Sequence, residues 1–108
     1  MFRKLLTIVL AFWLAFTTPA FAADLETGAK LFEVQCAGCH ANGGNIVRRG
    51  KTLKLKALER NGYASIDSIS EIITNGKGNM SAYKDRLSES EIQTVAAYVL
   101  DRANKDWH

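Results

Sequence analysis

The chain has 108 residues, of which 14 are Lys or Arg and 11 are Asp or Glu, and 47% of the residues are hydrophobic. This length permits one small domain, whose core alone stabilises the folded state by only a few kcal/mol. The net charge is +3, and it falls to +1 without the two basic residues near the start of the chain, so nucleic acid is not the expected partner.

The first 22 residues, MFRKLLTIVLAFWLAFTTPAFA, have the pattern of a secretory signal peptide, with a basic start, an apolar run from Leu5 to Phe16 and small residues at the end. The apolar run holds 12 residues, whereas a membrane-spanning helix needs about 20. We expect cleavage between Ala22 and Ala23, which leaves one domain over residues 23–108 that does not span a membrane. Cleavage removes two of the 14 basic residues and no acidic residue, so the net charge falls to +1.

The first half of the mature chain is predicted to contain two helices. Asp24 is placed to cap a helix that begins near Leu25 and runs into the cysteine segment. The asparagines and glycines of residues 41–45 predict a loop. A short helix is then expected over residues 52–61, with Gly62 ending it.

Two further helices are predicted in the second half. Isoleucines recur at helical spacing after Ser65, and this helix is expected to end at the NGKGN loop of residues 75–79. Ser88 and Glu91 form a capping box for the last helix, one face of which carries Ile92, Val95, Ala96, Val99 and Ala103. Since the chain shows no alternating strand pattern, the predicted fold class is all-α, with about four helices.

The stretch FEVQCAGCHANGG, residues 32–44, contains a CxxCH motif formed by Cys36, Cys39 and His40. Two thiols about one helical turn apart can form thioethers with the two vinyl groups on one edge of a porphyrin, and the next residue can place its imidazole on the iron. The signal peptide would deliver the chain to a compartment in which such attachment takes place. The motif therefore predicts one covalent haem c, with Cys36 and Cys39 as the tether and His40 as the proximal ligand.

Other sites use the same cysteine spacing. A structural zinc site needs four ligands, but the mature chain offers only the motif and His108, which we expect to be solvated and without a role. A thioredoxin-like motif follows a strand in a βαβ unit, a pattern that this sequence lacks. A plain disulfide, or a thiol oxidoreductase without haem, stays an alternative, although so short a disulfide loop would remove little entropy from the unfolded chain.

Met80 is the only methionine besides Met1, and it follows His40 by 40 residues. It lies in the glycine-rich stretch NGKGNMSAY rather than on an apolar helix stripe, which favours an iron ligand over a core residue. Histidine and methionine would occupy both faces of the iron and leave no position for a substrate. This arrangement predicts a one-electron carrier and not an enzyme, with water excluded from the haem by apolar residues such as Phe32, Ile72 and Tyr83.

Several segments resemble the photosynthetic cytochrome c6 group of class I cytochromes c, namely ADLETGAKLFEVQCAGCHANGGN, KTLKLKALE, NGKGNM and LSESEIQTVAAYVLDRANKDW. The resemblance implies a class I cytochrome c fold of four helices around one haem, thioethers at Cys36 and Cys39, and His40 and Met80 as axial ligands. It also implies a soluble carrier in the thylakoid lumen or periplasm, which we expect to be a monomer. This carrier would take electrons from the cytochrome bf complex and pass them to photosystem I or a terminal oxidase.

Other matches to the family concern packing and docking. Gly28 and Phe32 occupy positions that pack the first helix against the last, near Tyr98. Arg86 resembles an arginine that the family uses in docking to photosystem I, although an ordinary solvated charge explains it equally well. The basic stretch of residues 48–60 is open to the same two interpretations, a docking face for an acidic partner or a solvated helix face.

Two positions depart from the family pattern. Ser81 stands where the family usually has a proline after the ligand methionine, so the methionine loop is expected to be looser. Ile72 stands where the family usually has a glutamine near the haem, and an aliphatic residue there is expected to lower the potential. These departures resemble the divergent cytochrome c6-like paralogues. They keep two alternatives open: a lower-potential carrier with another redox partner, or a haem sensor or peroxidase-like protein if Met80 leaves the iron.

Overall fold

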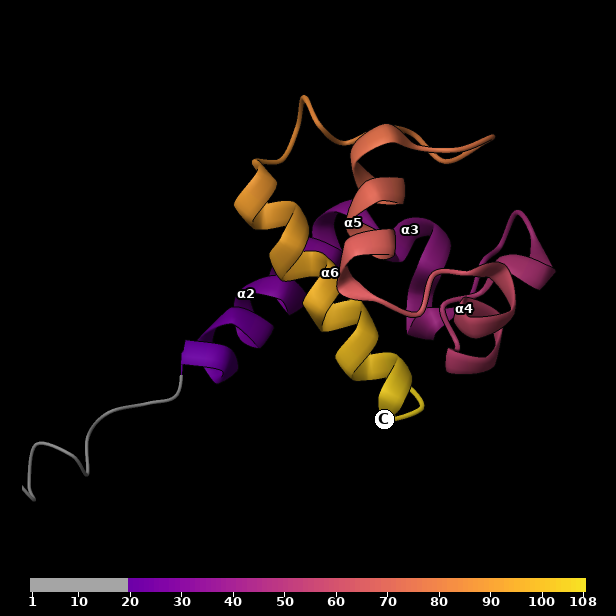
Figure 1. Cartoon of the computed structure of the whole chain (residues 1–108), viewed down its shortest axis with the longest axis horizontal. Helices are drawn as coiled ribbons and strands as arrows, with labels where there is room; N and C mark the ends of the chain where they lie inside the picture. The colour runs from indigo at the N-terminus through magenta and orange to yellow at the C-terminus, as the bar shows by residue number, and fades with distance from the viewer. Residues whose placement is uncertain (1–19) are drawn as a thin grey trace, which may run out of the picture.

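The computed structural model describes residues 20–108, so most of the predicted signal peptide lies outside the described residues. The elements follow one another along this part of the chain (Figure 1): α2 (Ala20–Gln35), α3 (Ala37–His40), the 3-10 turns η1 (Ala41–Gly43) and η2 (Arg49–Lys51), α4 (Leu55–Asn61), α5 (Ile66–Asn75) and α6 (Glu89–Asn104). Residues 20–108 contain no strand, only an isolated backbone bridge between Lys77 and Met80. The predicted all-α class is confirmed. Over the same residues, no helix combines the length and the apolar character that crossing a membrane requires.

Two of the predicted helix starts are wrong. Asp24 lies inside α2 rather than at its N-cap, because the alanine-rich sequence before it also favours a helix and extends the first turns back to Ala20. α4 begins at Leu55, three residues later than predicted. The amide of Leu53 donates a 2.7 Å hydrogen bond to the carbonyl of Gly43, so the backbone just before α4 pairs with a distant loop instead of entering the helix.

The first and last helices cross at Gly28, and Figure 1 shows this crossing of α2 and α6. A Cβ built at Gly28 would lie 2.7 Å from the Cβ of Tyr98 and 2.8 Å from the backbone oxygen of Thr94, so a side chain at this position would force the two helices apart. Phe32, about one turn further along α2, is buried, and its ring centroid lies 5.4 Å from that of Tyr98. The predicted packing of Gly28 and Phe32 near Tyr98 is confirmed.

The loop predicted over residues 41–45 begins with the 3-10 turn η1 (Ala41–Gly43). The predictions of helix ends hold. Ser88 Oγ accepts a hydrogen bond from the amide of Glu91 at 3.1 Å, and the Glu91 carboxylate accepts one from the amide of Ser88 at 2.9 Å, which completes the capping box of α6. Gly62 adopts the left-handed conformation that ends α4. Local sequence signals therefore determine where these helices begin and end.

The core lies where α2, α5 and α6 meet. The predicted face of α6 is buried, and it is formed by Ile92, Val95, Ala96, Val99 and Ala103. From α5, Ile69 and Ile73 are buried against it. Ile66, at the start of the same isoleucine pattern, is 39% exposed. Only part of the isoleucine stripe thus belongs to the core, and Ile72 faces the cavity described next.

Candidate functional site

The residues singled out in the sequence meet at one cavity of about 520 Å³. Cys36 lines it from the junction of α2 and α3, Cys39 and His40 line it from α3, and Met80 lines it from the loop after α5. The volume lies within the range of about 300–1000 Å³ that is typical of sites for small molecules and cofactors. The structure therefore brings all four predicted site residues to the same place.

The wall of this cavity is largely apolar. Buried or half-buried side chains form it, including Phe32, Leu58, Ile69, Ile72, Ile73, Tyr83, Val95 and Val99. Of the described residues that line the cavity, none is Asp or Glu, and the charged ones are Arg48, Lys51 and Lys77. Apolar walls suit the porphyrin ring, and cationic groups suit its two carboxylates. The chemistry of the lining therefore fits a haem.

A hydrogen bond from the second nitrogen of its ring orients His40. The imidazole Nδ1 lies 2.7 Å from the backbone oxygen of Gly44. Because a carbonyl oxygen can only accept, Nδ1 carries the proton and the lone pair of Nε2 is left available for a metal. The amide of His40 also donates to the carbonyl of Cys36 at 3.0 Å, which places the histidine one helical turn after the first cysteine. The chain thus orients the His40 ring so that Nε2 is the nitrogen available to a metal.

Cys36 does not have the properties of a redox-active thiol. Burial raises the pKa of Cys36 to about 11, so this thiol stays protonated at neutral pH. Thiol-exchange enzymes need the opposite, a thiol with a lowered pKa. Among the described residues, no group of three His, Cys, Asp or Glu side chains is placed to hold a metal ion.

Backbone contacts within its own loop hold Met80. The amide and the carbonyl of Met80 both exchange 3.0 Å hydrogen bonds with those of Lys77. The loop packs against Gly76, where a Cβ would come within 2.8 Å of three backbone atoms of residues 80–82. The φ of Gly76 is +69°, a conformation that residues with a side chain rarely adopt. The position of Met80 therefore depends on glycine at the end of α5.

Tyr83 joins the methionine loop to two helices. Its amide donates to the carbonyl of Ile73 at 2.9 Å, and its hydroxyl donates to the carbonyl of Gln35 at 2.9 Å. These bonds tie the loop to the ends of α5 and α2 without a proline at Ser81. The exposed guanidinium of Arg86 lies over the Tyr83 ring, 5.2 Å from its centroid.

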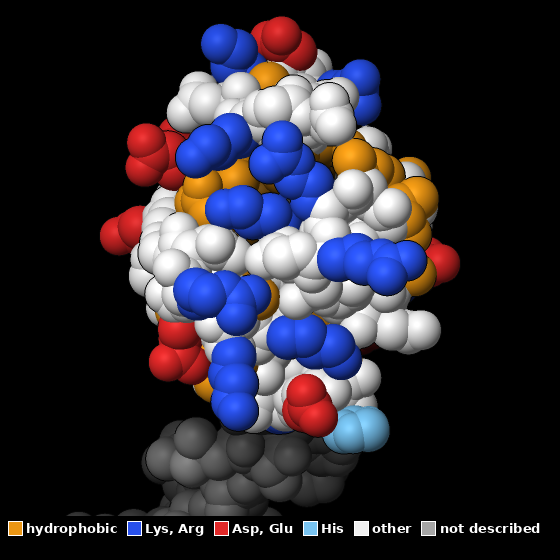
Figure 2. Space-filling model, turned by 90° about the vertical axis from the view of Figure 1, so that its right-hand side faces the viewer, with side chains coloured by type: hydrophobic (Ala, Val, Ile, Leu, Met, Phe, Trp, Pro, Cys, Tyr) orange, Lys and Arg blue, Asp and Glu red, His pale blue; other side chains and the backbone are white. Residues whose placement is uncertain are grey.

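The predicted basic stretch is exposed and reaches the cavity at two of its residues. All of its Lys and Arg side chains are exposed, namely Arg48, Arg49, Lys51, Lys54, Lys56 and Arg60. Arg48 and Lys51 also line the cavity, and the apolar side chains of Ile46 and Val47 are exposed beside them. Figure 2 shows the side of the molecule that carries α4, where Lys and Arg side chains gather around hydrophobic ones. We call this surface, formed by the six basic side chains, the basic face.

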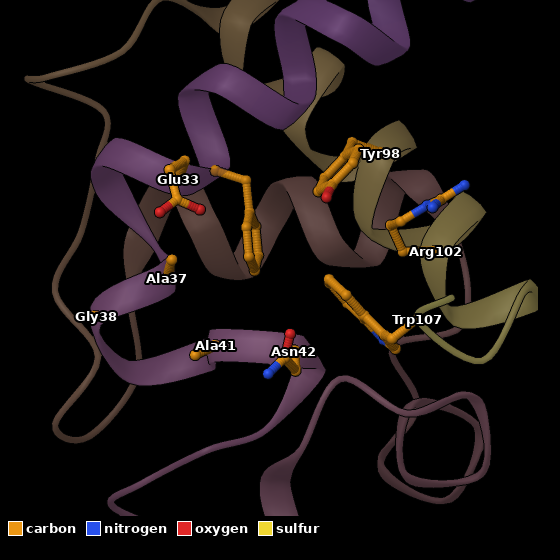
Figure 3. A pocket seen from close by; sticks show the side chains of 9 residues that line it. Glu33, Ala37, Gly38, Ala41, Asn42, Tyr98, Arg102 and Trp107 are labelled. Atoms are coloured by element: carbon orange, nitrogen blue, oxygen red, sulfur yellow. The ribbon is translucent and has the colours of Figure 1, made fainter.

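A second hollow, of about 550 Å³, was not predicted from the sequence. Phe32 lines both this hollow and the cavity of the CxxCH motif. Figure 3 shows Tyr98 and Trp107 directed toward the hollow, with Glu33 and Asn42 across from them. The Trp107 ring centroid lies 5.3 Å from that of Phe32. The only signal in the sequence was an aromatic residue that closes the last family-like segment.

Known proteins are similar in sequence to this chain over most of its length. Residues 23–99 match the family described as "Cytochrome C oxidase, cbb3-type, subunit III". A "Cytochrome c6-like" protein of Nostoc sp. (strain PCC 7120 / SAG 25.82 / UTEX 2576) is 54% identical over 107 residues, which cover 98% of this chain and 96% of the relative. A cytochrome c6 of Synechococcus sp. (strain ATCC 27167 / PCC 6312) is 52% identical over 100 residues, which cover 93% and 88%.

Solved structures share the fold. Cytochrome c6C from Synechococcus sp. PCC 7002 is 59% identical with a TM-score of 0.74, and the match covers 75% of this chain and 99% of that one. Oxidized cytochrome c6A from Arabidopsis thaliana is 35% identical with a TM-score of 0.76, over 79% and 95%. These findings confirm the class I cytochrome c fold and the haem c cofactor that the motif predicted. The chain belongs to the cytochrome c6 family, with c6-like paralogues among its relatives, and is an electron carrier with one covalent haem c, not an enzyme.

Proposed function

We propose that Cys36 and Cys39 hold the haem through thioethers, that His40 and Met80 are its axial ligands, and that the carrier transfers electrons from the cytochrome bf complex to photosystem I or a terminal oxidase. The working form is the single domain of residues 23–108, located in the thylakoid lumen or the periplasm after removal of the signal peptide. The observation that carries the proposal is the meeting of these four residues at one apolar cavity.

Each group has a separate part in the transfer. When bound, the haem supplies the one-electron change of its iron between the ferrous and ferric states. His40 donates through Nε2, because its Nδ1 is engaged with Gly44. The soft thioether of Met80 favours the ferrous state and raises the potential. The apolar side chains that α5 and α6 contribute to the cavity wall would keep water away from the metal.

The contacts around Met80 favour a carrier over a sensor or peroxidase-like protein. A sensor requires Met80 to leave and open a position for a small ligand. The backbone pair with Lys77, the packing on Gly76 and the bonds of Tyr83 hold the loop backbone beside the cavity, which favours a Met80 that stays at the iron. With His40 and Met80 both holding it, the iron would exchange electrons but offer no site for a substrate.

The charge of the basic face favours docking of a negatively charged partner. Arg48 and Lys51 belong both to this face and to the lining of the cavity, so a partner attracted by the charge would arrive next to the haem. Transient redox partners use small contacts that long-range electrostatics steer, and such contacts weaken as salt screens them. The exposed Arg86, which lies over Tyr83 of the cavity wall, supports a further docking contact.

A lower-potential carrier with a different redox partner is the second candidate. The observation that favours it is the position of Ile72, which lines the cavity with an aliphatic side chain. An amide at this place could hydrogen-bond within the pocket, whereas isoleucine cannot, and the hydrogen bonds around a metal centre tune its potential. A redox titration separates the candidates, since delivery to photosystem I needs a high potential.

The test of the proposal uses the mature protein purified after export in cells with the haem attachment machinery. Mass spectrometry should show one porphyrin bound to the chain, and the ferric spectrum should show the methionine-to-iron charge-transfer band. Met80→Ala should lose this band and bind carbon monoxide in the ferrous state, while wild type binds it poorly. Flash-induced reduction of photosystem I should be fast and should slow with added salt. A Met80→Ala spectrum equal to that of wild type would refute the ligand set.

A further inference from the structure

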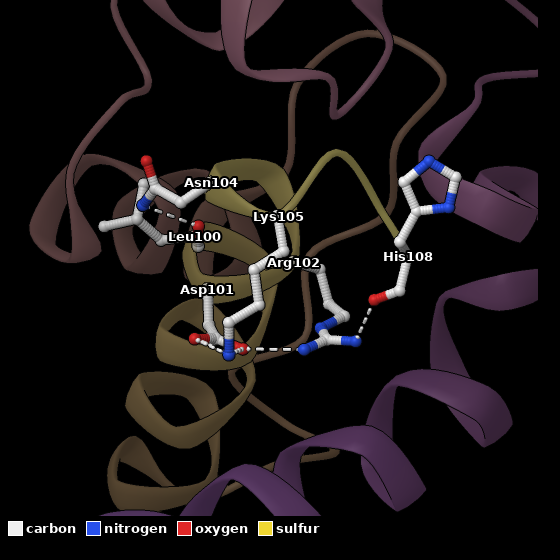
Figure 4. A network of polar contacts seen from close by, with 6 residues as sticks. All are labelled: Leu100, Asp101, Arg102, Asn104, Lys105 and His108. Carbon is white, nitrogen blue, oxygen red and sulfur yellow. Dashed lines mark hydrogen bonds and ion pairs between the residues drawn. The ribbon is translucent and has the colours of Figure 1, made fainter.

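Residues 105–108 fold back over the end of α6 instead of continuing away from it. The amide of Trp107 donates to the carbonyl of Arg102 at 2.7 Å. The Arg102 guanidinium donates to the backbone oxygen of His108 at 2.6 Å, as Figure 4 shows. Asp106 and Trp107 have φ values of 54° and 60°, in the left-handed region. Two successive residues with side chains adopt this conformation only where surrounding contacts compensate for it.

The compensating contacts are made by the Trp107 indole. Its Nε1–H donates to the carbonyl of Leu53 at 3.0 Å, across 54 positions of the sequence. Its ring packs against Phe32 and Tyr98, with centroid distances of 5.3 and 6.1 Å. A Cβ built at Gly43 would come within 2.6 Å of three indole atoms, so the ring lies directly against the backbone of Gly43.

Gly43 and Leu53 are themselves joined. The amide of Leu53 donates to the carbonyl of Gly43 at 2.7 Å. The indole therefore fixes the loop between them at two points, one by a hydrogen bond and one by direct contact. The residue that follows Gly43 is Gly44, whose backbone oxygen accepts the hydrogen bond from His40 Nδ1 at 2.7 Å.

From this chain of contacts we infer that Trp107 is a positioning residue for His40. By holding Gly43 against the indole, Trp107 aims the carbonyl of Gly44 at the imidazole and keeps the hydrogen bond to Nδ1 short. The inference rests on the proposed function only in taking His40 as an iron ligand. It adds that the fold-back of residues 105–108 influences the redox potential of the iron. These residues lie outside the CxxCH motif and outside the cavity lining.

The expected property is the redox potential. A hydrogen-bond acceptor on the outer nitrogen of a ligating histidine fixes the ring and raises its basicity. A more basic imidazole stabilises the ferric state relative to the ferrous state and so lowers the potential. Replacing Trp107 should weaken the hydrogen bond between His40 Nδ1 and the Gly44 carbonyl and so raise the midpoint potential. This effect is expected even though Trp107 does not line the cavity.

The experiment compares Trp107→Phe and Trp107→Leu with wild type in the mature haem protein. Phe keeps an aromatic ring against Gly43 but loses the donor to Leu53, and Leu loses both. We expect the midpoint potential to rise in both variants, more in Leu than in Phe. In NMR spectra of the reduced protein, the His40 Nδ1 proton should exchange faster with solvent in the same order.

A matched control separates positioning from general loss of stability. Ile92→Val removes a methylene group from a buried side chain of α6 that lines neither hollow, so it should lower the thermal midpoint and leave the potential and the His40 proton unchanged. If the Trp107 variants only lose stability, as this control does, the inference is wrong while the proposed function stands. If the wild-type spectra show no histidine ligation, the proposed function fails first. Phe is the milder replacement and remains informative if Leu does not fold.

Discussion

Replacing Gly76 with alanine tests whether the methionine loop is held in place by the end of α5. Gly76 has φ +69° and ψ 175°, a combination that is essentially restricted to glycine. A Cβ at this position would lie 2.5 Å from the oxygen of Met80, 2.7 Å from the nitrogen of Ala82 and 2.8 Å from the carbonyl carbon of Ser81. Because all three are backbone atoms, no rotation of a side chain can relieve the contact.

The expected loss of stability follows from two effects. Forcing a residue with a side chain into this conformation costs about 1–3 kcal/mol. Inserting a methyl group into a filled space costs about 1–3 kcal/mol more. If the loop stays in place, the free energy of unfolding should fall by about 2–6 kcal/mol, a large part of the 5–15 kcal/mol that is usual for a domain. If the loop moves instead, less stability is lost, but Met80 is displaced.

The assay must therefore follow stability and coordination together. Guanidinium unfolding of the ferric protein, measured by circular dichroism, gives the stability. The methionine-to-iron charge-transfer band reports whether Met80 binds the iron. Gly78→Ala is the matched control in the same loop, since Gly78 has φ +58° but a Cβ at this position would have no neighbouring atom within 4 Å. It should cost only the left-handed conformation, about 1–2 kcal/mol. If Gly76→Ala matched Gly78→Ala in both measurements, the close packing of the methionine loop on Gly76 would be refuted.

Three further changes test other parts of the fold and the site. Gly28→Ala should lower the thermal midpoint and reduce the free energy of unfolding by up to about 2 kcal/mol, because the clash with α6 outweighs a gain of about 1 kcal/mol in helix propensity. A higher midpoint would contradict the close crossing of α2 and α6. Ile72→Gln should raise the midpoint potential in a redox titration, and an unchanged potential would show that this position does not tune the haem. Burial acts to raise the pKa of Asp101, but the hydrogen bonds and charges of Lys105 and Arg102 lower it overall. The carboxylate thus stabilises the fold above its unfolded pKa of about 3.9, and this contribution is lost as pH falls through the lowered folded pKa. Asp101→Asn should cost up to about 1 kcal/mol in urea unfolding at neutral pH and nothing in strong acid, and a difference that did not change with pH would contradict this account.

The parts of the fold that sequence reasoning predicted are those that depend on near neighbours. The capping box of Ser88 and Glu91 needs residues three positions apart, and the left-handed end of α4 needs one glycine. The CxxCH motif is equally local, because one helical turn brings its residues together. Met80 was found because glycines and polar residues surround it, and the structure places it on the same cavity as His40.

The parts that were missed depend on contacts between distant segments. α4 starts later than predicted because the backbone of Leu53 is hydrogen-bonded to Gly43, and no sequence pattern around Leu53 predicts that bond. Trp107 reaches Leu53 across 54 positions, and Tyr83 reaches Gln35 across 48. Periodicity and capping rules carry no information about such pairs, so the hollow beside Trp107 and the anchoring of the methionine loop required the three-dimensional structure.

These distant contacts converge on the two segments that flank the proposed iron ligands. The core of α2, α5 and α6 forms from regular apolar faces, but His40 hydrogen-bonds to a carbonyl in an irregular loop, and Met80 lies in another. Short irregular segments with few buried contacts open easily when nothing ties them down. An electron carrier gains from ligands that keep their positions in both oxidation states, because any movement of the ligands adds to the barrier for transfer. Trp107 restrains the first loop from a distant part of the chain, and the Tyr83 hydroxyl ties the second loop to the end of α2, in addition to the local contacts that this loop makes with Lys77 and Gly76.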